Sequence, residues 1–168
     1  TKAPVISGTS TAAIRQSDMR DNAISKEHGT GAEATRELLD EFIVPRFGGG
    51  EGFDVGLDAL DDGAVFPIGD KAVVVTTDSH VVDPLEFPGG DIGRLAVAGT
   101  VNDLAVMGAT EQVSLTSSII VEDGFDLAVL ERVLDSMADT CAEAGCEIVA
   151  GDTKVMGGGD IDGLVFNT

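Results

Sequence analysis

The sequence predicts a domain of the α+β or α/β class, in which helices pack on one β-sheet. Short apolar runs that resemble strands alternate along the chain with longer helical patterns, and this alternation is typical of helices layered on a sheet. Hydrophobic residues make up 43% of the 168 residues, which is enough for one compact core. We expect a single domain over residues 25–168, preceded by a flexible tail over residues 1–24 that has few large apolar side chains.

The first predicted helix spans residues 33–44. Its apolar face is formed by Leu38, Leu39, Phe42 and Ile43. Pro45 has no backbone N–H to donate, and three glycines follow it at 48–50, so we expect the helix to end there.

Two strands are predicted next. The first spans residues 58–66 and is entered through acidic residues. The second spans residues 72–77 and ends at Asp78, and its continuous apolar run is typical of a strand that is buried on both faces. Residues 81–90 contain two prolines and two glycines and are expected to form a loop.

Two longer helices follow the loop. Asp91 is the expected N-cap of a helix that runs to Met107, and Gly108 ends it. Asp126 is the expected N-cap of the next helix, and Gly145 ends that one. Apolar residues recur along this helix in steps of three and four, which places on one face Leu127, Leu130, Leu134, Met137 and Cys141.

The remaining strands are predicted over residues 113–121, over residues 147–150, which run into residues 151–154, and from Leu164 onward. The glycines at 157–159 are expected to form the turn between the last two strands. The sequence ends within the pattern of the final strand.

The charge of the chain argues against two classes of partner. Thirty acids against 10 bases give a formal net charge of -20, which repels nucleic-acid phosphates and anionic lipid. Trp and Tyr, which stack well on bases, are absent. No apolar run approaches the roughly 18 residues of a membrane span and no signal peptide is visible. We therefore expect a cytoplasmic protein that binds neither nucleic acid nor membranes, and the excess of acids favours a halophilic host.

Two cysteines, Cys141 and Cys146, are too few for a disulfide framework or a four-cysteine zinc site. Cys141 lies on the apolar face of a predicted helix, and Cys146 begins a predicted strand. Both are therefore expected to be reduced thiols in the core.

Acidic residues recur where apolar strands or helices meet loops, at Asp62, Asp78, Asp103 and Asp152. Magnesium takes oxygen ligands, with one or two carboxylates for each ion beside water and phosphate. Four converging carboxylates would suit ions that bridge a polyphosphate. The alternative is that these aspartates are ordinary surface acids, because 30 acids make acidic clusters common.

Asp152 has neighbours that suit a phosphate site. Gly151 permits a close approach of the backbone, Thr153 offers a hydroxyl, and Lys154 can neutralise a phosphate oxygen. No P-loop motif and no dinucleotide-binding glycine motif is present. His28 and His80 have no partners that indicate a metal or nucleophile cluster, so His80 is interpreted as a structural histidine. His28 is interpreted as a loop histidine, and the alternative, a phosphate loop, is suggested by its glycine neighbours.

Five motifs, in this order and spacing, resemble the HypE family of [NiFe]-hydrogenase maturation proteins. They are residues 61–65 (DDGAV), 76–79 (TTDS), 87–97 (FPGGDIGRLAV), 99–109 (GTVNDLAVMGA) and 151–155 (GDTKV). Residues 28–31 (HGTG) resemble the His-Gly-x-Gly-Gly loop of that family, with Ala32 in place of its last glycine. The resemblance covers residues 25–168.

The resemblance implies an α+β fold, that of the N-terminal domain of the AIR synthetase (PurM-like) superfamily. Its mixed sheet has helices packed on one face and pairs with a second copy in a homodimer, near which ATP would bind. Carried over to this chain, magnesium would be held by Asp62, Asp78, Asp103 and Asp152. The nucleotide would contact Thr76, Thr77, Asn102, Gly151, Thr153 and Lys154.

The resemblance also implies a reaction. HypE receives a carbamoyl group from HypF on a C-terminal cysteine, dehydrates it with ATP to a thiocyanate, and passes cyanide to the HypC–HypD complex. Lys154 would be the catalytic residue if it moves a proton on the amide; the alternative is that it only neutralises phosphate. The C-terminal domain and its cysteine are not in this chain, so we expect it to bind nucleotide without completing the reaction.

Two other functions stay open. The first is a different enzyme of the same superfamily, such as a thiamine-monophosphate kinase. The second is a non-catalytic, dimerising acidic scaffold. Binding of ATP with magnesium separates the enzymes from the scaffold.

Overall fold

The computed structural model describes residues 23–168, so most of the predicted tail lies outside the described residues. The chain divides into two compact units between Arg46 and Phe47. A boundary after residue 24 therefore stays a prediction. The two units are described separately below.

The first unit is helical. A 3-10 turn, η1 (Lys26–Gly29), precedes helix α2 (Glu33–Leu38), a π-helical turn η2 (Leu39–Ile43) and helix α3 (Val44–Phe47). These elements confirm the predicted helix, but Pro45 does not end it. The elements α2, η2 and α3 follow one another without a break, so Pro45 lies near the end of a helical run from Glu33 to Phe47. Proline removes one backbone hydrogen bond, and the helix continues for only two residues beyond it.

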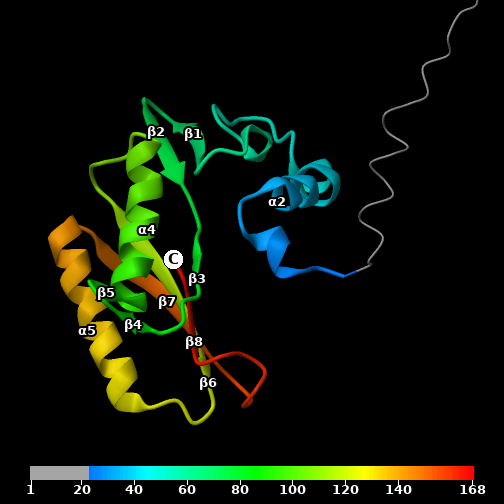
Figure 1. Cartoon of the computed structure of the whole chain (residues 1–168). Helices are drawn as coiled ribbons and strands as arrows, with labels where there is room; N and C mark the ends of the chain where they lie inside the picture. The colour runs from blue at the N-terminus through cyan, green and yellow to red at the C-terminus, as the bar shows by residue number, and fades with distance from the viewer. Residues whose placement is uncertain (1–22) are drawn as a thin grey trace, which may run out of the picture. The chain divides into compact units, whose positions relative to one another are not determined.

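The second unit begins with an antiparallel hairpin of β1 (Ala64–Ile68) and β2 (Lys71–Val75) (Figure 1). The prediction of a strand from residue 58 is wrong, because Leu57–Ala59 forms a 3-10 turn, η3, and the acids lie in the loop before β1. The expected burial of β2 on both faces is also wrong. In the described part of the chain β2 pairs only with β1, and Val75 is 51% exposed.

A four-stranded mixed sheet forms the centre of the second unit, in the order β3-β8-β6-β7. Its strands are β3 (Ser79–His80), β6 (Ser114–Glu122), β7 (Glu147–Met156) and β8 (Leu164–Asn167). β6 runs parallel to β7, whereas β8 is antiparallel to both β6 and β3. The predicted loop contains a small hairpin of β4 (Glu86–Phe87) and β5 (Gly90–Asp91). The mixed sheet is confirmed.

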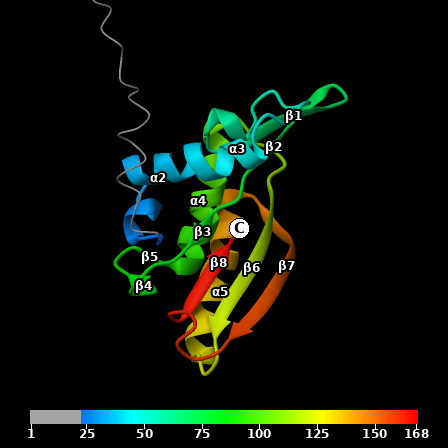
Figure 2. The ribbon, with the colours of Figure 1, turned by 90° about the vertical axis from the view of Figure 1, so that its right-hand side faces the viewer.

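Helices α4 (Ile92–Val106) and α5 (Leu127–Ala144) cover one face of this sheet, as predicted (Figure 2). Asp91 caps α4 by accepting a hydrogen bond from the Arg94 N–H, and Asp126 caps α5 by accepting one from the Ala128 N–H. Gly145 ends α5 in the left-handed conformation that favours glycine. Both caps and the C-terminal glycine confirm the prediction.

The core lies between the two helices and the sheet. Its largest fully buried side chains are Phe166, Ile92, Met137, Leu164, Val97 and Val133. The predicted apolar face of α5 is only partly correct, because Leu127 is 78% exposed and Leu134 37% exposed. Leu127 begins the helix, and Val133 contacts the core in place of Leu134 because α4 lies close to that side of α5.

Both cysteines are free and buried, as predicted. Burial, followed by the neighbouring Cys146, raises the pKa of the Cys141 thiol to about 11. The thiol therefore stays protonated at neutral pH. Within residues 23–168, every helix is too short or too polar to cross a bilayer.

Candidate functional site

Three of the predicted aspartates gather around one end of α4. Burial raises the pKa of the Asp103 carboxyl above its ordinary value, and the negative charges of Asp78 and Asp62 raise it further. His80 and the Thr76 hydroxyl act in the opposite direction. Charges perturb one another in this way only at short range. Asp62, Asp78 and Asp103 therefore form one group, called the acidic cluster below.

The loop that carries Asp62 is held against the end of β2. The Thr76 hydroxyl donates a hydrogen bond of 2.7 Å to the backbone carbonyl of Asp62. Gly63 follows, and a Cβ atom there would lie 3.0 Å from the Val75 carbonyl oxygen and 3.4 Å from the Met107 side chain. Glycine thus allows the loop to approach both β2 and the C-terminal end of α4.

Asp78 is held by the end of β8. Its backbone N–H donates to the Thr168 carbonyl at 2.8 Å, and its own carbonyl accepts from the Thr168 N–H at 2.9 Å. The Asn167 side chain donates a further bond of 3.0 Å to that carbonyl. The Asp78 Oδ1 atom accepts from the Ser79 N–H at 2.8 Å. Backbone and carboxylate are therefore both oriented.

The small residue Gly99 brings α4 close to Asp78. A Cβ atom at this position would lie 3.3 Å from Asp78 Oδ2 and 2.7 Å from His80 Cε1. Asp103 is four residues further along α4 and so lies on the same side of the helix. This close approach explains why the charges of Asp78 and Asp103 interact.

The acidic cluster has an excess of negative charge. No lysine or arginine of the described residues lies within 4.0 Å of its carboxylates, and the one basic contact is His80 Nε2 at 3.5 Å from Asp78 Oδ2. No group of three or more His, Cys, Asp or Glu side chains within residues 23–168 is close enough to hold a metal. Magnesium needs only one or two carboxylates beside phosphate and water, so in this arrangement at most two of the three aspartates could share one such ion.

The fourth predicted aspartate lies elsewhere. Asp152 is on β7 and pairs with Ser118 of the neighbouring strand β6. Ser118 also pairs with Asn167 of β8, and Asn167 pairs with Ser79 of the edge strand β3. Three strand spacings, about 14 Å, therefore separate Asp152 from the β3 edge. Within one chain, the structure brings together three of the four predicted aspartates and not the fourth.

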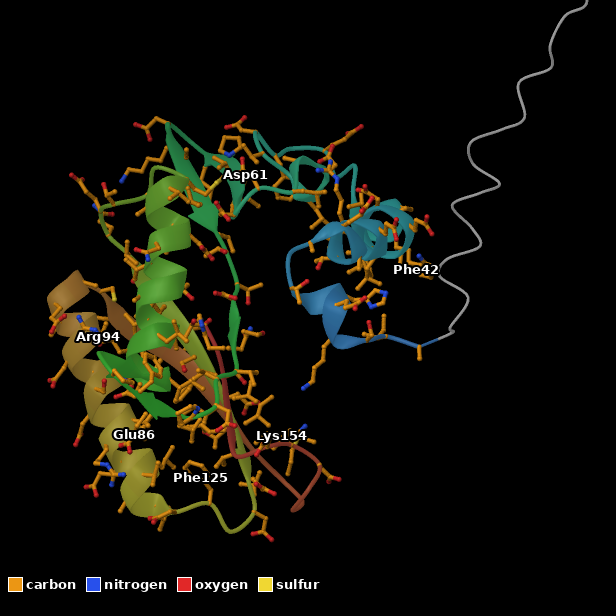
Figure 3. The ribbon with its side chains drawn as sticks, in the orientation of Figure 1. Phe42, Asp61, Glu86, Arg94, Phe125 and Lys154 are labelled. Carbon is orange, nitrogen blue, oxygen red and sulfur yellow. The ribbon has the colours of Figure 1, made fainter. Side chains whose placement is uncertain are left out.

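The residues around Asp152 are exposed on β7. Gly151 is required there, because a Cβ atom would lie 2.4 Å from the Ser117 carbonyl oxygen on β6. Lys154, two residues along the strand, shares the face of Asp152, while Thr153 faces the other side. Figure 3 shows Lys154 far from Asp61, which precedes the first aspartate of the acidic cluster. Gly151, Asp152 and Thr153 border an open hollow of about 560 Å³.

The other predicted nucleotide contacts lie near the acidic cluster. Thr76 binds the Asp62 loop, and Asn102 is exposed on α4 beside Asp103. The Thr77 hydroxyl contacts the Asn167 side chain at 3.3 Å. Thr76 also lines a cavity of about 440 Å³ between β2 and β6, whose wall combines apolar and polar side chains. The cluster therefore has an adjoining space large enough for a small ligand or a peptide segment.

Sequence reasoning missed two residues that support the acidic cluster. His80 is 6% exposed and contacts Asp78, although it was interpreted as unrelated to the site. The signal was present: Asp78 and His80 are two residues apart at the start of a strand, so their side chains share a face. Asn167 carried no comparable signal, because its contacts with Thr77, Asp78 and Ser79 span about 90 residues of sequence.

Replacing Asp103 by asparagine should stabilise the metal-free protein at neutral pH. The folded protein raises the pKa of this carboxyl, so its contribution to stability is most favourable below the ordinary pKa and is lost as pH rises through the raised value. The difference in the free energy of unfolding between Asp103→Asn and the unchanged protein should fall to zero near about pH 3, where the carboxyl is protonated in both the folded and the unfolded state. Urea unfolding in EDTA over a pH series measures it. Asp139→Asn, on the exposed side of α5, is the control, and an Asp103→Asn variant less stable at pH 7 would contradict the effect.

Comparison with known families gives one match to most of the second unit. Residues 60–168 match the family described as AIR synthase related protein, N-terminal domain. The match includes the whole acidic cluster and the segment around Asp152.

Comparison with individual proteins gives concordant results. The chain is 42% identical over 151 residues to carbamoyl dehydratase HypE of Azotobacter vinelandii, covering 90% of this chain and 42% of the relative. It is similar to the crystal structure of a HypE–HypF complex, with a TM-score of 0.65 and 41% identity over 82% of this chain and 40% of the other. It is also similar to a HypE structure in complex with ATP, with a TM-score of 0.55 and 40% identity over 84% and 40%. The chain thus spans about two fifths of the length of these relatives.

Proposed function

Because the chain belongs to the family of AIR synthase related proteins, of which it carries the N-terminal domain, we propose that it binds ATP together with magnesium. We further propose that it is the nucleotide-binding part of a carbamoyl dehydratase of the HypE type. The observation that carries the proposal is the acidic cluster, whose carboxylates raise the pKa of Asp103 and have no lysine or arginine beside them among the described residues. The relative that was crystallised with ATP supports the choice of nucleotide.

The acidic cluster would hold magnesium. A magnesium ion there would neutralise the charge on phosphate oxygens during phosphoryl transfer. The Ser79 N–H orients the Asp78 carboxylate before any ligand binds. The Thr76 hydroxyl does the same for the loop that carries Asp62. Such preorganisation lowers the cost of ordering the ligands. Thr77 and Asn102, both exposed near the cluster, would offer polar contacts to the triphosphate.

We propose that a second copy of the chain supplies further contacts to the nucleotide, from Gly151, Asp152, Thr153 and Lys154. Within one chain Asp152 is too far from the acidic cluster to share an ion with it. Exposed apolar side chains on β7 support an interface there, since Ile148, Val149 and Val155 are 42%, 61% and 63% exposed. Lys154 lies on the same face as Asp152 and would neutralise a phosphate oxygen or move a proton on the substrate amide.

The activity of the whole protein is proposed to be the ATP-dependent dehydration of a carbamoylated cysteine to a thiocyanate. ATP would convert the amide oxygen into a phosphate leaving group, and magnesium would stabilise the transferred charge. The relative crystallised with HypF supports HypF as the partner that delivers the carbamoyl group. The HypC–HypD complex is the proposed acceptor of the cyanide.

Isothermal titration calorimetry of this chain with ATP tests the proposal. Saturable binding is expected when magnesium is in excess over ATP, because the ion bridges carboxylates and phosphate, and much weaker binding is expected in EDTA. The titration is repeated at high salt because the chain carries a net charge of -20. No detectable binding in either buffer would leave the acidic scaffold as the remaining function.

Replacing Asp152 by asparagine is expected to abolish magnesium-dependent ATP binding and leave the melting temperature unchanged. The side chain is exposed on β7, so its loss removes a ligand without disturbing the core. The same calorimetry measures the affinity. Asp126→Asn is the matched control, since Asp126 only caps α5. Unchanged affinity in the Asp152 variant would remove this residue from the proposed site.

A further inference from the structure

A buried histidine connects the acidic cluster to the core of the second unit. His80, the last residue of β3, is only 6% exposed. Its Nε2 atom lies 3.5 Å from Asp78 Oδ2 and 3.5 Å from the Thr168 hydroxyl. Asp78 itself is half-buried, so the histidine contacts the carboxylate from the protein side and leaves the other side open to a ligand.

The surroundings leave the imidazole ring little freedom. A Cβ atom at Gly99 would lie 2.7 Å from His80 Cε1, so the backbone of α4 passes directly beside the ring. The Thr168 hydroxyl on the other side is itself bonded to Thr100 Oγ1 at 2.5 Å and to the Ala96 carbonyl at 3.2 Å. The ring is thus held between α4 and the end of β8.

The two oxygens of the Asp78 carboxylate have different partners. Oδ1 accepts a hydrogen bond from the Ser79 N–H, and Oδ2 faces His80 Nε2. The hydrogen bond orients Oδ1, and the ring beside Oδ2 limits the rotation of the carboxylate. Of the described residues, His80 is the one basic side chain within 4.0 Å of the cluster, so nothing else of that kind restrains Asp78.

We propose that His80 is a positioning residue: the Nε2 edge of its ring, 3.5 Å from Asp78 Oδ2, limits where that carboxylate can lie and keeps it beside Asp103 when a divalent cation and a nucleotide arrive. Partners of a metal ligand commonly act in this way, by orienting the ligand without touching the metal. The affinity measurements that test this inference rest on the proposed function, whereas the contact between His80 and Asp78 is independent of it.

Two amide substitutions that differ only in reach provide the test. In His80→Gln the amide NH₂ reaches approximately to the position of Nε2, whereas in His80→Asn it stops near Nδ1. The magnesium concentration that half-saturates ATP binding should rise by about tenfold in His80→Asn and stay within about threefold of the unchanged protein in His80→Gln. Glutamine also restores side-chain volume, so His80→Met, of similar size but without an N–H donor, is the control and should lose as much as His80→Asn. Affinity in His80→Met equal to that of His80→Gln, or no loss in His80→Asn, would overturn the inference.

A second measurement needs no ligand. The chain has two histidines, and replacing His28 by glutamine assigns their ring nitrogens in ¹⁵N NMR spectra. Asp78→Asn should move the ring nitrogen signals of His80 and leave those of His28 unchanged. If the unchanged protein shows no magnesium-dependent ATP binding, the proposed function fails and these signals alone decide the positioning. Unmoved His80 signals would overturn it.

Discussion

Replacing Asp78 by asparagine is expected to weaken magnesium-dependent ATP binding by at least the roughly 10- to 100-fold that loss of an outer-shell partner costs, with little change in the melting temperature. Asparagine has the same shape and can still accept the hydrogen bond from the Ser79 N–H. It removes one negative charge from the acidic cluster, where that charge acts on Asp103. The variant therefore loses a cation ligand without losing its place in the fold.

Calorimetry at several magnesium concentrations measures the effect of Asp78→Asn. ATP binding in EDTA, where the carboxylate has no cation to hold, should be unchanged or slightly stronger, because one like charge is removed from beside the phosphates. Asp126→Asn again serves as the control for a general loss of acidity. Wild-type affinity in a folded Asp78→Asn protein would exclude Asp78 from the site and weaken the case for the whole cluster.

Replacing Gly93 by alanine is expected to destabilise the second unit by about 3 kcal/mol or more. Gly93 lies where α4 crosses α5, and a Cβ atom there would lie 2.2 Å from the Val133 carbonyl oxygen of α5. That oxygen belongs to the backbone, so the two helices would have to separate. Separation would expose side chains such as Val97 and Val133, which are both fully buried.

The direction of this effect distinguishes the clash from helix propensity. Alanine in a helix interior is better than glycine by about 1 kcal/mol, so a loss of stability can come only from the close approach of α5. Urea unfolding measures it. Gly158→Ala is the matched control, since the nearest atom to its Cβ would be Glu122 Oε1 at 3.8 Å, an ordinary contact. Equal stability of the two variants would show that α4 and α5 can move apart at little cost.

Local features of the sequence predicted most elements of the second unit correctly. Asp91 and Asp126 cap their helices because a short carboxylate accepts a backbone N–H in the first turn whatever the surroundings. Gly145 ends α5 because only a residue without a side chain adopts its left-handed conformation readily. These interactions involve neighbours within a few residues, so the order of residues is sufficient to predict them.

The errors concern contacts between distant parts of the chain. The apolar run of β2 indicated a fully buried strand, but burial depends on which strands pair with it, and in the described chain only β1 does. The helical period of α5 predicted Leu134 in the core, while the close approach of α4 at Gly93 selects Val133. A sequence pattern describes the face of an element and not the element that covers it.

For the candidate site, too, the sequence predicts the residue types and only the fold decides which of them meet. Residue type and position alone indicated that Asp62, Asp78, Asp103 and Asp152 are candidate ligands, because they recur where apolar strands or helices meet loops and magnesium takes carboxylate oxygens. Only the folded chain shows that Asp62, Asp78 and Asp103 share one end of α4, that Asp152 lies three strands away, and that His80 supports Asp78. The physical reason is range: side-chain chemistry is a property of each residue, whereas the distance between two carboxylates depends on strand order and helix packing, which link residues far apart in the chain.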